Sequence, residues 1–123
     1  MTTTVLVIDD DRLVRDSLNR VLSKAGFTVL TAENGARGIQ ILAQNNASVV
    51  VTDIIMPEME GIQTIQELRK QWPNLPIIAI SGGGRRGNLD FLKAAAAFGA
   101  RAVLQKPFSN DDLVSAVRTA IAS

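Results

Sequence analysis

The chain has 123 residues, of which 46% are hydrophobic and 20% charged, and its formal net charge at pH 7 is +1. This length and composition fit one globular domain with a single hydrophobic core, and the small net charge gives no overall attraction to nucleic acid. Cysteine and histidine are absent, which excludes disulfides, His-dependent catalytic triads and zinc or copper sites built on thiolate or imidazole. No segment is long and apolar enough to span a membrane, and the first residues lack the basic start of a signal peptide, so a cytoplasmic location is expected.

The first half of the chain alternates short apolar runs, which predict buried strands, with stretches whose apolar residues recur at helical spacing. The elements expected there, in chain order, are a strand over 4–8, a helix between Asp11 and Gly26, a strand over 27–31, a helix between Asn34 and Asn45, and a strand beginning with 49–51. Aspartate and asparagine are expected as caps because their side chains accept hydrogen bonds from the first N–H groups of a helix. The valine strand ends at Asp53, and Pro57 and Gly61 mark the loop that follows.

The second half continues the alternation. The elements expected there are a helix over 62–71 stopped by Pro73, a strand over 77–80, a helix between Asn88 and Gly99, a strand over 102–104, and a last helix capped by Ser109 or Asn110. Five strand patterns that alternate with five helix patterns predict an α/β fold, in which helices cover both faces of a parallel sheet.

Polar residues follow the expected strands at their carboxyl ends, where the functional residues of open parallel sheets collect. They are Asp9 and Asp10 after the first strand, Asp53 after the third, Ser81 after the fourth and Lys106 after the fifth. Three carboxylates held together repel one another unless a cation joins them. Mg²⁺ is the expected cation, because it prefers oxygen ligands. A carboxylate nucleophile, a metal, a lysine and a hydroxyl are together the parts needed to form an aspartyl phosphate.

At these residues the chain resembles the receiver domain of two-component response regulators. The matching motifs, in the order in which that family has them, are VLVIDDD, DIIMPEMEG, IAIS, Gly99-Ala100 and QKPF. The resemblance covers nearly the whole chain and implies a flavodoxin-like fold whose five-stranded parallel sheet has the order 2-1-3-4-5. It further implies a stand-alone receiver over 1–123 and a cis peptide bond between Lys106 and Pro107.

The resemblance also implies a role for each of the polar residues. Asp53 is the expected phosphoacceptor, Ser81 is expected to hydrogen-bond the phosphoryl group, and Lys106 is expected to pair first with the Asp53 carboxylate and then with the phosphate. The expected Mg²⁺ ligands are the carboxylates of Asp53 and Asp10, the Asp9 carboxylate mainly through water, and the backbone carbonyl of Ile55.

The implied function is a phosphorylation switch and not a turnover enzyme. Its expected partners are a histidine kinase or a histidine phosphotransfer protein, which supplies the phosphoryl group, and a downstream protein effector; neither nucleic acid nor a membrane is expected. Three readings stay open beside it: a phosphorelay shuttle, a receiver that is part of a larger protein, and a pseudo-receiver that docks without phosphotransfer. A Mg²⁺-dependent phosphatase would usually carry a second acid two residues beyond its aspartyl nucleophile, where this chain has Ile55.

The chain departs from the family pattern near the end of the fifth strand. Val103 stands three residues before Lys106, where the family commonly has Tyr or Phe. Signalling through movement of an aromatic side chain is therefore not expected. Ile55 and Gly83 also lack the polar side chains that could position an attacking water, so slow loss of the phosphoryl group is expected.

Overall fold

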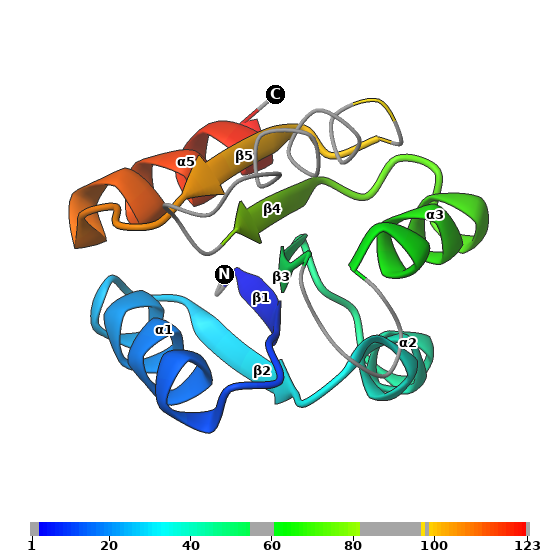
Figure 1. Ribbon diagram of the computed structural model, residues 1–123, viewed down its shortest axis with the longest axis horizontal. Coiled ribbons are helices and arrows are strands. Elements are labelled where there is room, and N and C mark those ends of the chain that lie inside the picture. The colour runs from blue at the N-terminus through cyan, green and yellow to red at the C-terminus, as the bar shows by residue number, and fades with distance from the viewer. Residues whose placement is uncertain (1–2, 55–60, 82–96, 98, 123) are drawn as a thin grey trace.

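The computed structural model describes residues 3–54, 61–81, 97 and 99–122, and its elements carry the labels of Figure 1. The strands are β1 (Thr4–Ile8), β2 (Thr28–Ala32), β3 (Val49–Asp53), β4 (Ile77–Ser81) and β5 (Ala102–Gln105). The helices in the described residues are α1 (Arg12–Lys24), α2 (Gly35–Gln44), α3 (Gly61–Gln71) and α5 (Asn110–Ala122). The helix expected between Asn88 and Gly99 falls almost wholly outside the described residues.

The five strands form one parallel sheet in the order β2-β1-β3-β4-β5. Helices α1 and α5 cover one face, and α2 and α3 cover the other (Figure 1). Because a parallel connection has to cross over the sheet, each helix packs on a face and both faces become buried. The expected α/β fold, its flavodoxin-like strand order and its two helical layers are confirmed.

The capping residues expected from the sequence lie at the N-termini of the helices. The Asp11 carboxylate accepts hydrogen bonds from two N–H groups in the first turn of α1, and the Asn34 side chain accepts one in the first turn of α2. Ser109, one of the two candidates, is the cap of α5: its hydroxyl accepts from the N–H of Asp112, whose carboxylate accepts from the N–H of Ser109. This reciprocal pair is a capping box, which satisfies two backbone donors at once.

The core lies on the two faces of the central strands. Every residue of β3 and β4 is buried, whereas the edge strand β5 alternates between half-buried and exposed residues. Leu13 belongs to the apolar series of α1, yet its side chain is 80% exposed. Val103, on the edge strand, is 38% exposed. Among the described residues, no helix has both the length and the apolar character needed to cross a bilayer.

Candidate functional site

Strand register brings the polar residues together. Ile8 pairs with Thr52, so the next residues of these two strands, Asp9 and Asp53, lie level at the carboxyl edge of the sheet. On the other side of β3, Asp53 pairs with Ile80, and Ser81 follows at the end of β4. Parallel strands place their carboxyl ends at one edge, and this register places the predicted site residues there in neighbouring positions.

The carboxylates of Asp9, Asp10 and Asp53 form a cluster. An oxygen from each lies within 4.8 Å of an oxygen from the other two. Asp9 is fully buried, Asp53 is nearly so, and Asp10 is exposed. The cluster is therefore open to solvent on the Asp10 side and closed beneath Asp9, a geometry that lets an ion enter from the edge of the sheet.

Asp9 gives the clearest indication that this cluster suits a bound cation. Its Oδ1 accepts a hydrogen bond of 2.9 Å from the N–H of Asp11, but Oδ2 is buried and has no hydrogen-bond partner within the described part of the chain. Burial raises the pKa of the Asp9 carboxyl from 3.8 to about 6; the Asp11 hydrogen bond opposes the rise, and the Asp53 charge adds to it. A buried oxygen without a partner and a crowded negative charge both fit a hard divalent cation with oxygen ligands.

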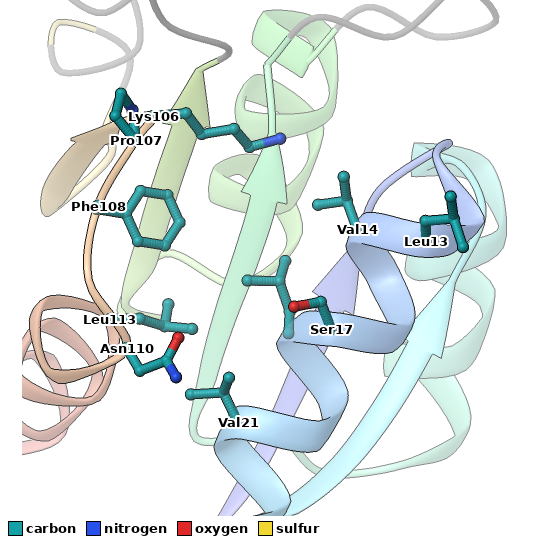
Figure 2. Close-up of a pocket in the computed structure, with 10 residues that line it drawn as sticks. Leu13, Val14, Ser17, Val21, Lys106, Pro107, Phe108, Asn110 and Leu113 are labelled. Carbon is teal, nitrogen blue, oxygen red and sulfur yellow. The ribbon is translucent and has the colours of Figure 1, made fainter.

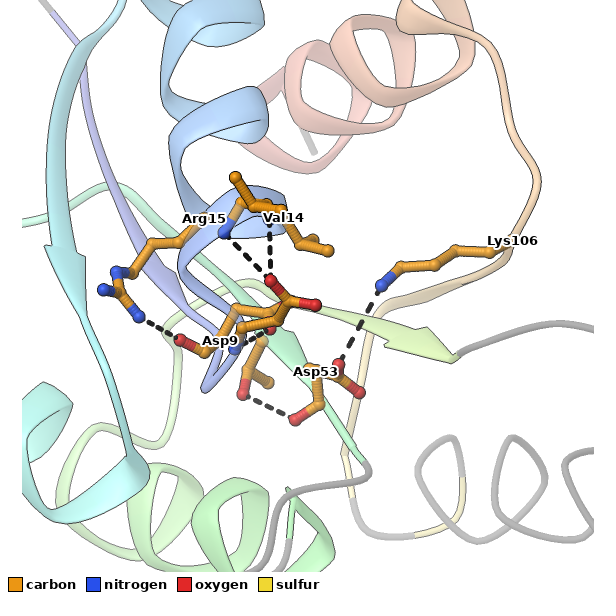
Figure 3. Close-up of polar contacts among 8 residues, drawn as sticks. Asp9, Val14, Arg15, Asp53 and Lys106 are labelled. Atoms are coloured by element: carbon orange, nitrogen blue, oxygen red, sulfur yellow. Dashed lines mark hydrogen bonds and ion pairs between the residues drawn. The ribbon is translucent and has the colours of Figure 1, made fainter.

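Lys106 reaches the cluster from the other side. Its ammonium nitrogen lies 4.0 Å from Oδ2 of Asp53 (Figure 3). The backbone N–H of Lys106 donates to the carbonyl of Ser81 at 2.9 Å, which ties the end of β5 to the end of β4. The buried Ser81 is itself the last residue of its strand. The Lys106–Pro107 peptide bond is cis, as the resemblance implied.

Arg15 is a residue of this site that sequence reasoning missed. Its guanidinium donates a 2.8 Å hydrogen bond to the backbone carbonyl of Asp9 (Figure 3). This bond spans the turn between β1 and α1, and it holds the segment that carries Asp9 and Asp10 against the helix. The sequence did contain a signal for this contact, because Arg15 lies one turn into a predicted helix that directly follows an acidic segment.

Gly61 explains the last position of the DIIMPEMEG motif. Its N–H donates to the carbonyl of Ile54, and a Cβ at this position would overlap the backbone of Ile54. Gly61 therefore lies directly against the residue that follows β3, and only glycine permits so close an approach. Ile55, the predicted carbonyl ligand, lies outside the described residues.

An apolar hollow of about 420 Å³ lies beside the site, between α1 and the segment that follows β5. Figure 2 shows Lys106, Pro107 and Phe108 along one side and residues of α1 along the other. The exposed Leu13 is one of the α1 residues that line this hollow. Access to Lys106 is thus bordered by apolar side chains.

Comparison with known proteins agrees with this geometry. The family model of the response regulator receiver domain matches residues 5–118. Response regulator MprA of Mycobacterium sp. (strain KMS) is 35% identical over 118 residues, which are 96% of this chain and 50% of MprA. The DNA-binding transcriptional regulator NtrC of Escherichia coli (strain K12) is 38% identical over 117 residues, which are 95% of this chain and 24% of NtrC. The chain thus spans half or less of the length of these two relatives.

Solved structures agree on the fold. A putative response regulator from Chloroflexus aurantiacus superposes with a TM-score of 0.93 at 28% identity, with all of both chains covered. A response regulator receiver domain protein from Clostridium thermocellum superposes with a TM-score of 0.90 at 33% identity, over 98% of this chain and 94% of that one. With the family match, the strand order and the acidic cluster in agreement, the chain belongs to the response regulator receiver domain family.

Proposed function

We propose that residues 1–123 act as one cytoplasmic phosphorylation switch. Asp53 takes a phosphoryl group from the histidine of a histidine kinase or a histidine phosphotransfer protein, and the phosphorylated protein changes its affinity for a downstream protein effector. These 123 residues contain no histidine, so the donor histidine lies outside them. Receiver domains are not turnover enzymes. The chain catalyses only its own phosphorylation.

One observation carries the proposal. The nearly buried Asp53 carboxylate lies between two kinds of charge, the carboxylates of Asp9 and Asp10 and the ammonium of Lys106 at 4.0 Å. A purely structural ion pair needs only one acid and one base. Two further acids at the same point cost stability unless a cation and an incoming anion complete the site.

In the transfer step a carboxylate oxygen of Asp53 attacks the phosphorus of the partner's phosphohistidine. The new P–O bond forms as the P–N bond breaks, and the electron pair of the broken bond returns to the imidazole, which then takes up a proton. Lys106 stabilises the negative charge on the phosphoryl oxygens, and the Ser81 hydroxyl donates a hydrogen bond to one of them. Both residues are held at the strand ends by the Lys106 to Ser81 backbone hydrogen bond.

The carboxylates of Asp9, Asp10 and Asp53, with the backbone carbonyl of Ile55, would hold Mg²⁺. When bound, the ion neutralises charge on the phosphoryl oxygens during transfer. Asp9, which the protein buries beneath the other two, keeps its side chain fixed by accepting from Asp11 and leaves Oδ2 for the ion or one of its waters.

The test is an intact-mass measurement after incubation with acetyl phosphate, with and without Mg²⁺. The expected result is a gain of one phosphoryl group, about 80 Da, in the wild type and only with Mg²⁺. Asp53→Asn should gain nothing. Asp16→Asn is the matched control, because it removes an exposed carboxylate on α1. This variant should be phosphorylated like the wild type.

Two outcomes would contradict the proposal. Modification of Asp53→Asn at the wild-type rate would place the phosphoryl group elsewhere. Failure to modify the wild type, together with no Mg²⁺-dependent binding of beryllium fluoride, would leave a pseudo-receiver that works by docking alone.

A further inference from the structure

Thr52 is a polar residue in an apolar part of the sheet. It is fully buried and directly precedes Asp53 on β3. In the strand register it pairs with Ile8 on β1 and with Ala79 on β4, and both of these belong to the core between the sheet and helices α2 and α3. The residues directly opposite Thr52 on the two neighbouring strands are therefore apolar.

Packing alone does not explain a threonine at this position. The three preceding residues of β3 are valines, Val49–Val51. Valine has nearly the same shape as threonine and carries no group that needs a hydrogen bond, whereas a hydroxyl that is buried without one costs free energy. The reason for the hydroxyl is therefore sought in the hydrogen bond that it makes.

The Thr52 hydroxyl bonds to the backbone of the residue that carries the phosphoacceptor carboxylate. Among the described residues it makes one hydrogen bond, which it donates to the backbone carbonyl of Asp53 at 3.1 Å. Side chains alternate along a strand, so the Thr52 hydroxyl and the Asp53 carboxylate lie on opposite sides of β3. The hydroxyl therefore acts on the carboxylate through the backbone.

This hydrogen bond fixes one end of the peptide group that follows Asp53. At the other end of the same peptide group, the N–H of Ile54 donates to the carbonyl of Ile80 at 3.0 Å. The orientation of the peptide group is set by the ψ angle of Asp53, because the group itself is planar. With both ends bonded, ψ cannot change unless a buried hydrogen bond breaks, which costs free energy.

The position of the Asp53 backbone matters because its carboxylate lies between two sets of charges. An oxygen of Asp53 lies within 4.8 Å of oxygens of Asp9 and Asp10, and Oδ2 lies 4.0 Å from the ammonium nitrogen of Lys106 (Figure 3). A change in ψ of Asp53 would shift its Cα relative to the sheet, and the carboxylate with it. A displacement of about 1 Å at a reacting group can slow a reaction by about a hundredfold.

We propose that Thr52 is a positioning residue for the phosphoacceptor. Its hydroxyl holds the Asp53 carbonyl, and through it keeps the Asp53 carboxylate between the acidic cluster and Lys106. This inference rests on the proposed phosphotransfer to Asp53. It adds to that proposal a residue that belongs neither to the acidic cluster nor to the ion pair with Lys106.

The test compares two substitutions of Thr52 that differ in the hydroxyl. Thr52→Val removes the hydroxyl and keeps the shape, whereas Thr52→Ser keeps the hydroxyl and removes the methyl group. The rate of phosphorylation by acetyl phosphate at saturating Mg²⁺ is followed by intact mass. Thr52→Val is expected to react about tenfold more slowly than the wild type. Thr52→Ser is expected to react at close to the wild-type rate.

Two control variants separate positioning from a general loss of stability. Val117→Ala truncates a fully buried residue of α5, so it should lower the free energy of unfolding and leave the phosphorylation rate unchanged. Thr28→Val makes the same chemical change as Thr52→Val at the exposed first residue of β2, and it should also react like the wild type. Denaturant unfolding of every variant shows that the protein is folded under the conditions of the rate measurement.

Amide hydrogen exchange tests the positioning without phosphotransfer. In Thr52→Val the peptide group after Asp53 keeps only its bond to Ile80, so the Ile54 amide is expected to exchange at least about tenfold faster relative to the Val51 amide. In Thr52→Ser the ratio of these two exchange rates should stay that of the wild type. NMR of the full ¹⁵N-labelled chain measures both amides in one experiment.

The outcomes separate this inference from the proposed function. If the wild type is phosphorylated, the positioning role is overturned by a wild-type rate in Thr52→Val, or by equally slow reaction of Thr52→Val and Thr52→Ser, which would indicate packing. If the wild type takes no phosphoryl group, the proposed function fails and hydrogen exchange decides. Unchanged exchange of the Ile54 amide in Thr52→Val would then overturn the positioning role, and faster exchange would support it for the Asp53 backbone.

Discussion

The ammonium nitrogen of Lys106 lies 4.0 Å from Oδ2 of Asp53, and the two residues come from the ends of strands that are separated by β4. The lysine side chain is 28% exposed and the aspartate side chain 11%. Solvent and salt therefore screen this pair less than an ion pair on the open surface. The proposed transfer step predicts that the Lys106 ammonium pairs with the phosphoryl group once that group is attached to Asp53.

Replacement of Lys106 by methionine is expected to slow phosphorylation of Asp53 by acetyl phosphate. The methionine keeps the apolar stem and removes the charge that stabilises the transferring oxygens, so the expected loss in rate is about a hundredfold. The rate is measured by intact mass over time at saturating Mg²⁺. Lys70→Met, on α3, is the matched control. An unchanged rate in Lys106→Met would show that the lysine does not take part in the transfer step.

Without divalent cations, the contribution of Asp9 to stability is expected to fall between pH 4 and pH 7. The pKa of this carboxyl is about 6 in the folded protein and 3.8 in its ordinary state. The folded state therefore holds the proton more tightly, and this contribution is complete below pH 4 and lost as pH rises through 6. About 2 pKa units correspond to about 3 kcal/mol of unfolding free energy.

Asp9→Asn separates this contribution from those of other groups. In EDTA, denaturant unfolding of the variant should depend less on pH than that of the wild type, and the variant should be the more stable protein at pH 7. Addition of Mg²⁺ at pH 7 should stabilise the wild type and have a smaller effect on the variant, since ligands that bind only the folded state stabilise it. Parallel pH profiles for the two proteins would contradict the assignment.

Arg15→Met is expected to weaken Mg²⁺ binding. The guanidinium of Arg15 contacts the backbone carbonyl of Asp9 and no carboxylate of the cluster, so its role is to position the acidic segment. Loss of such outer support typically costs about tenfold in metal affinity. Affinity is measured by calorimetry. Arg12→Met, which removes only an exposed ion pair with Asp16, should bind Mg²⁺ like the wild type, and Arg15→Lys should recover part of the loss.

Gly99→Ala is expected to destabilise the fold by about 2 kcal/mol. Gly99 has a φ of +119°, which strains any residue with a side chain, and a Cβ there would lie 2.8 Å from Nε of Arg69. The Arg69 guanidinium also donates to the Gly99 carbonyl at 2.6 Å and to that of Pro73 at 2.7 Å.

A double-mutant cycle measures how much of this cost comes from the contact with Arg69. Arg69→Ala alone should destabilise through loss of its hydrogen bonds. Gly99→Ala should then cost less in the Arg69→Ala background than in the wild type, because only the backbone strain remains. Denaturant unfolding gives all four free energies, and strict additivity would show that the guanidinium does not crowd the added methyl group.

Local sequence patterns predicted most elements of this fold correctly. The Asp11 and Asn34 caps, the buried valine strand and the proline stop after α3 each depend on side chains that interact within a few residues. The expectation of a parallel sheet also predicted that four polar residues would meet at its carboxyl edge, and the structure brings them there. These residues are Asp9, Asp53, Ser81 and Lys106. The role of Ile55 and the helix after Asn88 lie outside the described residues and stay predictions.

The sequence by itself therefore determined the alternation of elements and the chemical kinds of residue at the strand ends, because hydrophobic period and capping act locally. Only the tertiary structure decided that Asp9 and Asp53 lie level, that Arg15 donates to the Asp9 carbonyl, and that Leu13 is exposed. These relationships join residues far apart in the chain, and strand register and helix packing, which no local pattern encodes, set the distances between them.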